Sequence, residues 1–193
     1  MQFPDICVSC GHIGHHSPQI PTTEDLLGTP VRPEIERKWR LYGVSGSFHF
    51  GDTVINILQG YLETPDSYEI RLRCKNGSEC SLGVKSSGAL VRSEWETPVP
   101  VEVFDKFWRM TKDRIHKKRR IFTHNGYKLE VDFYMGSRLS GLIIIECEFI
   151  SKEEAAAFQL PDWLRPHVKE VTYDLRYKNR NLACLGSLQE LSM

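Results

Sequence analysis

Pairs of charged residues two positions apart recur along this 193-residue chain. Clustered carboxylates bind hard divalent cations such as Mg²⁺ or Mn²⁺, whereas arginine and lysine bind phosphate oxygens. A site that combines both kinds could therefore hold a polyphosphate together with its metal ions. The pairs are Glu34 and Glu36, Arg71 and Arg73, Glu94 and Glu96, Lys118 and Arg120, Glu130 and Asp132, and Glu146 and Glu148.

A spacing of two residues places both members of each pair on one face of a β-strand. Solvent on the polar face of an open sheet does not require paired charges on strand after strand. A closed barrel with a charged interior does, because every strand then contributes to one enclosed site. The residues predicted to face this interior are Lys38, Arg40, Arg71, Arg73, Lys85, Arg92, Lys118, Arg120, Glu34, Glu36, Glu94, Glu96, Glu130, Asp132, Glu146 and Glu148. Arg37 and Lys117 are out of phase with this pattern and are predicted to face outward.

The elements that must position these charges are mostly strands. Helices are predicted at 101–110, after two prolines, and from Ser151, where a capping box begins a helix that ends before Pro161. Their aromatic residues, Phe104, Phe107, Trp108 and Phe158, are predicted to cover the outside of the sheet. Strands separated by turn signals are predicted at 34–41, 54–62, 68–75, 81–86, 91–97, 115–122, 127–134 and 142–149. The predicted fold class is α+β, a closed eight-stranded antiparallel β-barrel with a charged interior and helices packed outside.

Residues 1–32 differ from the rest and are predicted to be an N-terminal extension, followed by the barrel domain at 33–193. The extension is either disordered or a small Cys/His segment. Cys7 and Cys10, in Cys-Val-Ser-Cys-Gly, have the spacing of one zinc knuckle, so a structural Zn²⁺ there is one hypothesis. A tail without metal is the alternative.

Overall composition argues against several classes of partner. The 25 basic residues balance 25 acidic ones, so no net field draws the chain to nucleic acid or to an anionic membrane. No apolar run approaches the roughly 18 residues of a membrane span, and a cytoplasmic monomer or homodimer is predicted. The six cysteines do not form a compact framework, which favours free thiols.

Six motifs occur in order along the chain: Glu34-x-Glu36-x-Lys38, Gln59-Gly60-Tyr61, Arg71-x-Arg73, Lys118-x-Arg120, Glu146-x-Glu148, and Glu-Val-Thr-Tyr-Asp-x-Arg-Tyr-x-Asn at 170–179. Together they resemble the CYTH family of triphosphate tunnel metalloenzymes, of the short, stand-alone inorganic triphosphatase type. The resemblance covers roughly residues 33–183 and implies a tunnel that binds a small anionic substrate with Mg²⁺ or Mn²⁺.

The resemblance also implies roles for single residues. Tyr61 and Lys85 would cooperate near the reacting phosphorus, although Gly83 stands where the family commonly has threonine two positions before this lysine. The implied metal ligands are Glu34, Glu36, Glu94, Asp132, Glu146 and Glu148. The implied phosphate-binding residues are Lys38, Arg71, Arg73, Lys85, Lys118 and Arg120.

These residues favour a metal-dependent hydrolase that cleaves inorganic tripolyphosphate to pyrophosphate and phosphate, with water as the nucleophile. Nucleoside or thiamine triphosphate hydrolysis and a class IV-type adenylyl cyclase are the alternatives within the enzyme class. A non-enzymatic polyphosphate sensor is the alternative outside it. Carboxylate pairs on both the first and the last predicted strand favour catalysis, because a sensor needs the cations more than the metals.

Overall fold

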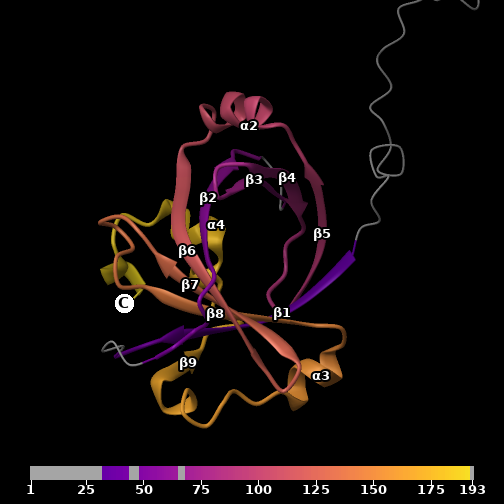
Figure 1. Cartoon of the computed structure of the whole chain (residues 1–193). Coiled ribbons are helices and arrows are strands. Elements are labelled where there is room, and N and C mark those ends of the chain that lie inside the picture. The colour runs from indigo at the N-terminus through magenta and orange to yellow at the C-terminus, as the bar shows by residue number, and fades with distance from the viewer. Residues whose placement is uncertain (1–31, 44–47, 65–67, 192–193) are drawn as a thin grey trace, which may run out of the picture.

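The computed structural model describes residues 32–43, 48–64 and 68–191 of the chain. Within these ranges nine strands form one antiparallel sheet in the order β5-β4-β3-β2-β6-β7-β8-β1-β9. β1 also pairs with β5, which closes the first eight strands into a barrel (Figure 1). The strands are β1 (Arg32–Leu41), β2 (Val54–Leu62), β3 (Glu69–Lys75), β4 (Glu79–Lys85), β5 (Val91–Pro98), β6 (Asp113–His124), β7 (Tyr127–Tyr134), β8 (Ile143–Phe149) and β9 (Val168–Glu170).

The predicted fold class and all eight predicted strands are confirmed. β1 closes the barrel by pairing with β5 through Arg32–Ile35 and with β8 through Ile35–Leu41. The short β9 lies against Trp39–Leu41 and was not predicted, because three residues are too few to show alternation. Asn76-Gly77 and Asn125-Gly126 both have positive φ and turn the β3–β4 and β6–β7 hairpins, as their sequences predict.

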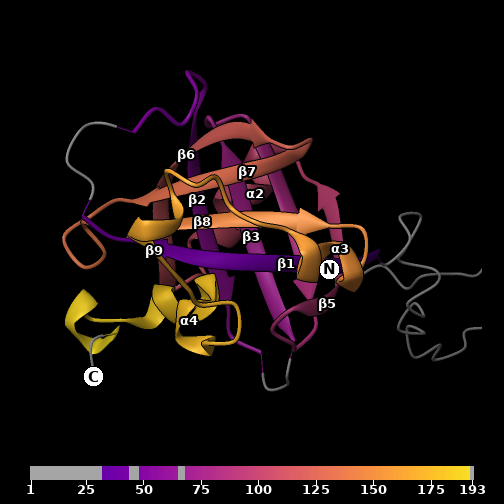
Figure 2. The ribbon, with the colours of Figure 1, turned by 90° about the horizontal axis from the view of Figure 1, so that it is seen from below.

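The helices of the described ranges are α2 (Val101–Trp108), α3 (Lys152–Ala157) and α4 (Asn179–Cys184), which lie around the barrel (Figures 1 and 2). Ser151 caps α3 by accepting a hydrogen bond from Glu154 N at 3.1 Å, which confirms the predicted start. Phe104 of α2 is buried against the outer face of β3 and β4, whereas Phe107 is 37% exposed. Covering the sheet therefore falls to Phe104 and, in part, Trp108.

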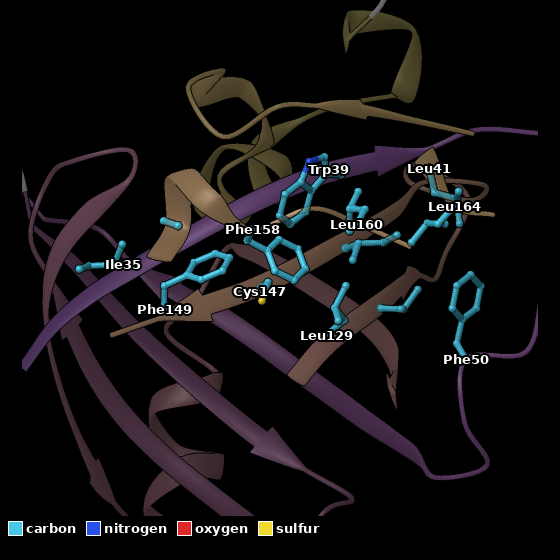
Figure 3. Packing of buried hydrophobic residues seen from close by; sticks show 13 residues of the cluster. Ile35, Trp39, Leu41, Phe50, Leu129, Cys147, Phe149, Phe158, Leu160 and Leu164 are labelled. Carbon is cyan, nitrogen blue, oxygen red and sulfur yellow. The ribbon is translucent and has the colours of Figure 1, made fainter. Parts of the chain in front are cut away.

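A larger apolar cluster lies under α3 and the segment that follows it. Figure 3 shows Trp39, Phe149 and Phe158 close together, and the ring centroid of Phe158 lies 5.9 Å from that of Trp39 and 5.3 Å from that of Phe149. Removing these aromatic surfaces from water stabilises the outer wall of the barrel at β1 and β8.

The C-terminal segment closes one end of the barrel. Ile115 and Ile144 face the interior, two positions from Lys117 and Glu146 respectively, and both pack in one cluster with Leu182 of α4. In Figure 2, α4 lies below β1, toward one edge of the strands. None of the described helices is long and apolar enough to cross a membrane.

The expectation of free thiols is wrong for one pair. Cys74 and Cys80 are directly opposite across β3 and β4, with Cα atoms 4.0 Å apart, and form a disulfide. Their pairing depends on the hairpin register, which the spacing of the cysteines does not reveal. Cys147 and Cys184 are free thiols, whereas Cys7 and Cys10, with the predicted zinc site, lie outside the described residues.

Candidate functional site

A charged cavity lies inside the barrel, with about 560 Å³ of space between atoms when its opening to solvent is included. All eight barrel strands contribute to its wall. The lining residues include seven cations and seven carboxylates, so the formal charges of the wall balance. They are Lys38, Arg71, Arg73, Lys85, Arg92, Lys117, Arg119, Glu34, Glu36, Glu69, Glu94, Glu130, Glu146 and Glu148, together with Gln59, Tyr61 and Asn179.

Three carboxylates of β1 and β8 form the densest acidic group. Glu36 and Glu148 are directly opposite across the two strands, and Glu34 lies two residues before Glu36 on the same face. Carboxylate oxygens from Glu34, Glu36 and Glu148 lie within 4.8 Å of one another. Like charges opposite each other destabilise a sheet unless a cation lies between them. Oxygen-only donors at this separation suit a hard divalent ion such as Mg²⁺ or Mn²⁺.

Glu34 and Glu36 have pKa values shifted in opposite directions. Burial opposes ionisation of Glu34, but Lys85 and Arg92 outweigh it and lower the pKa of Glu34 to about 2. Burial, together with Glu146 and Glu34, raises the pKa of Glu36. A bound cation would favour the ionised form of Glu36, because it replaces the proton that burial favours.

The cavity lysines of β1 and β4 are held by carboxylates. Lys38 Nζ donates to Glu146 at 2.5 Å and also contacts Glu36. Lys85 Nζ lies 2.7 Å from Glu34 and 3.3 Å from Glu94. The absence of a threonine at position 83 therefore does not turn Lys85 away from the interior.

The two arginines of β3 present unused donors to the cavity. Arg71 Nη2 donates to Glu94 and Glu96, both at 2.8 Å, and Arg73 Nη2 donates to Glu96 at 2.6 Å. Within the described part of the chain, the buried Nε atoms of Arg71 and Arg73 have no hydrogen-bond partner. A buried N–H without an acceptor costs about 1 to 3 kcal/mol, so both guanidinium groups are suited to donate to oxygen atoms of a ligand.

On β6 the prediction of which basic residues face inward is wrong. Lys117 and Arg119 line the cavity, whereas Lys118 is exposed and Arg120 donates to Gly51 O at 2.6 Å outside it. The register explains this phase, because Arg119 is directly opposite Asp132 of β7. Asp132 accepts from Arg119 Nε at 2.7 Å and from Lys117 Nζ at 2.5 Å.

Several expected interior residues therefore lie beside the cavity rather than in its wall. Asp132 is fully buried and already has two cationic partners, so it does not join the acidic trio. Arg40 donates to Tyr177 Oη at 2.8 Å, near the closed end of the barrel. Arg37 faces outward, as predicted, where it pairs with Glu170 at 2.7 Å.

A neutral group lies where the cavity meets the closed end. Gln59 Nε2 donates to Tyr61 Oη, and Tyr134 Oη donates to Asn179 Oδ1 at 2.5 Å. Sequence reasoning did not single out Gln59, Glu69 or Asn179 as lining residues. Each has a signal in the sequence: Gln59 and Asn179 belong to motifs noted above, and Glu69 extends the spacing of Arg71 and Arg73 by one step.

The fold and site together define a β-barrel protein with an enclosed binding site suited to a polyanion and a divalent cation. No protein-family model matches the chain. It is 40% identical over 154 residues to an inorganic triphosphatase of Nitrosomonas europaea, an alignment that covers 78% of this chain and 96% of that protein. Solved structures of an inorganic triphosphatase and of a hypothetical protein each match 78% of this chain. Their sequence identities are 37% and 38%, their own chains are covered to 93% and 97%, and both TM-scores are 0.56.

The identity and coverage are high enough to decide the family. This chain belongs to the family of inorganic triphosphatases.

Proposed function

We propose that the protein hydrolyses inorganic tripolyphosphate to pyrophosphate and phosphate with Mg²⁺ or Mn²⁺, in the manner of the CYTH triphosphate tunnel enzymes. The observation that carries this proposal is the cavity wall of seven cations and seven carboxylates, in which Glu36 is directly opposite the exposed Glu148. Enclosed charges cost several kcal/mol unless they are paired or bound to an ion. A linear polyphosphate with its metal satisfies both signs of charge, and the name of the relative from Nitrosomonas europaea agrees with this substrate.

The acidic trio is proposed to hold the metal. Glu34, Glu36 and Glu148 supply three carboxylates within 4.8 Å of one another. A divalent cation bound there neutralises phosphate charge and activates water. The expected further ligands Glu94, Glu146 and Asp132 lie outside this group of three and accept from a lysine or arginine, so we assign them to holding the cations in place.

The phosphates of the substrate are proposed to bind the cations of the wall in place of their present carboxylate partners. Lys38, Lys85, Arg71 and Arg73 already lie in the cavity with partners from neighbouring strands. Arg119 and Lys117 replace Arg120 and Lys118 in this role, because they are the β6 side chains that reach the cavity. Substrate binding then exchanges one set of charge-assisted hydrogen bonds for another, which avoids leaving any cation buried and unpaired.

Proton transfer is assigned to Tyr61 and a lysine. Burial raises the pKa of Tyr61, so its hydroxyl stays protonated and can donate to a phosphate oxygen. Burial lowers the pKa of Lys117 to about 8, so a minor fraction of Lys117 is neutral near neutral pH and can take up the proton of the attacking water. Burial and Arg71 also lower the pKa of Lys85, which the resemblance places near the reacting phosphorus, so Lys85 is the alternative.

Substrate choice is proposed to follow the number of linked phosphates. Tyr61 is the sole aromatic residue among those described as lining the cavity, and its hydroxyl is engaged by Gln59. This leaves little surface for stacking a base, whereas cations extend over several strands. Tripolyphosphate reaches more of them at once than pyrophosphate does.

The test is phosphate release from tripolyphosphate, ATP, thiamine triphosphate and pyrophosphate under one metal and one pH. The proposal predicts the highest kcat/KM for tripolyphosphate and poor turnover of pyrophosphate. Faster turnover of ATP would favour a nucleotide enzyme. Cyclic AMP among the products would identify a cyclase, and tight binding without turnover would identify a sensor.

A further inference from the structure

One edge of β1 changes its partner strand at Glu36 and Lys38, the residues proposed to bind the metal and the phosphates. On one side β1 pairs with β8 without interruption, so that Glu36 and Lys38 are opposite Glu148 and Glu146. On the other side, the pairing of β1 with β5 ends at Ile35, and its pairing with β9 begins at Trp39. No strand covers 36–38 on that side within the described ranges. The position of these residues therefore depends on other contacts.

A side chain from the C-terminal segment fills this gap. Thr172 is buried, and its Oγ1 accepts a hydrogen bond from Lys38 N at 3.0 Å. Val171 N donates to Lys38 O at 2.9 Å, so both backbone groups of Lys38 are held by consecutive residues of one segment. Glu36 N is held separately, by Leu90 O at 3.0 Å.

Thr172 is itself fixed by an ion pair outside the barrel. Its hydroxyl donates to Glu170 Oε1 at 2.7 Å. Glu170 receives a two-point contact from Arg37, with Nε at 2.9 Å and Nη2 at 2.7 Å. Arg37 Nη1 also donates to Ala155 O at 2.6 Å and Phe158 O at 3.0 Å, which ties the unit to the end of α3.

We infer that Arg37, Glu170 and Thr172 form a positioning unit that sets Glu36 and Lys38 for the metal and the phosphates. The unit lies on the outer side of β1 and would contact neither the metal nor the phosphates. The inference rests on the proposed function. Arg37 lies between Glu36 and Lys38 in sequence, so a shift of this part of β1 moves both cavity side chains together. Residues that orient metal ligands typically contribute about 10- to 100-fold to metal affinity.

Thr172→Val is the decisive variant. Valine keeps the shape of threonine but removes the acceptor for Lys38 N and the donor to Glu170. Thr172→Ser restores both contacts. Thr111→Val is the matched control, because Thr111 is also a buried threonine with two hydrogen bonds, to Trp108 O and from Arg114 Nε, at the junction of α2 and β6.

The measurements are Mn²⁺ affinity of the full-length protein without substrate, by electron paramagnetic resonance of free Mn²⁺, and kcat and KM for tripolyphosphate. Thr172→Val is expected to bind Mn²⁺ about 10- to 100-fold more weakly and to lose kcat/KM. Thr172→Ser and Thr111→Val are expected to keep near wild-type values, even if Thr111→Val melts at a lower temperature. Glu170→Gln, which is partly exposed and less disruptive, is expected to shift Mn²⁺ affinity in the same direction by less.

Wild-type Mn²⁺ affinity in folded Thr172→Val, or equal losses in Thr172→Val and Thr111→Val, would overturn the positioning role. Failure of the wild-type protein to bind Mn²⁺ or to hydrolyse tripolyphosphate would instead contradict the proposed function. If Thr172→Val does not fold, Glu170→Gln with unchanged Mn²⁺ affinity overturns the inference by itself.

Discussion

The same strands build two different interiors in one barrel. On β8, Glu146 belongs to the charged cavity, whereas Ile144, two residues earlier, is buried against the C-terminal segment. On β6, Lys117 and Arg119 line the cavity while Ile115 packs in the apolar cluster. On both strands, the interior face therefore changes from charged to apolar within two residues.

The closed end of the barrel provides stability, and the charged end provides the chemistry. Apolar burial at the closed end is favourable without a partner molecule. Enclosed ion pairs contribute little net stability, because their attraction is largely offset by desolvation. A charged interior is therefore better explained by a ligand than by folding. Variants at the charged end should change activity, and variants at the closed end should change stability.

Glu36→Gln should give the largest effect on activity. The change removes one carboxylate from the acidic trio and with it a metal ligand, while it also relieves repulsion with Glu148. We expect turnover of tripolyphosphate to fall by about 100-fold or more at an unchanged melting temperature. Steady-state kinetics and thermal denaturation check this, with the exposed Glu153→Gln as the control. Normal turnover, or a loss fully explained by unfolding, would contradict the assignment.

Lys117→Met and Lys118→Met compare the two faces of β6 at adjacent positions. Lys117 reaches the cavity and Lys118 is exposed on the outside. Loss of a general base costs about 100- to 10,000-fold in rate, so Lys117→Met should be nearly inactive and Lys118→Met close to wild type. Kinetics of both proteins decide the comparison. A greater loss in Lys118→Met would restore the inward phase that the sequence suggested.

Leu182→Ala tests the closed end. Leu182 is fully buried in the apolar cluster. Deleting a buried leucine side chain to alanine costs about 2 to 5 kcal/mol, whereas the folded fraction should retain most of its turnover. Urea denaturation measures the loss of stability. Kinetics at urea concentrations below the unfolding transition measure the turnover that is retained. Leu175→Ala, at a side chain that is 53% exposed, should change neither appreciably. Activity lost without a loss of stability would break the division between the two ends.

A smaller effect is expected in the dependence of stability on pH. Burial lowers the pKa of Lys117 from 10.5 to about 8. Between these values the unfolded chain binds more protons at this lysine than the folded protein does, so rising pH should stabilise the fold. The contribution is about 1 kcal/mol per pH unit. Unfolding free energies of wild type and Lys117→Met from pH 8 to 10 check this. Equal slopes for the two proteins would show that Lys117 has an ordinary pKa.

Most of the barrel could be predicted from the sequence because its strands are long enough to show alternation and are bounded by Asn-Gly and proline signals. The phase of β6 could not, since Lys117, Lys118, Arg119 and Arg120 give both faces the same chemistry. Packing decides the phase of β6. Ile115 is buried in the apolar cluster at the closed end, and the buried Asp132 requires a cation at the opposite position on β6, which is Arg119. The disulfide depends on the register of the β3–β4 hairpin. The contact of Thr172 with β1 depends on a segment distant in sequence, which no local pattern encodes.

Metal dependence is the direct test of the proposed function, because the acidic trio is assigned to the metal. Tripolyphosphate hydrolysis should stop in excess chelator and return when Mg²⁺ or Mn²⁺ is restored, while circular dichroism shows an unchanged fold. Undiminished turnover in excess chelator would contradict the account.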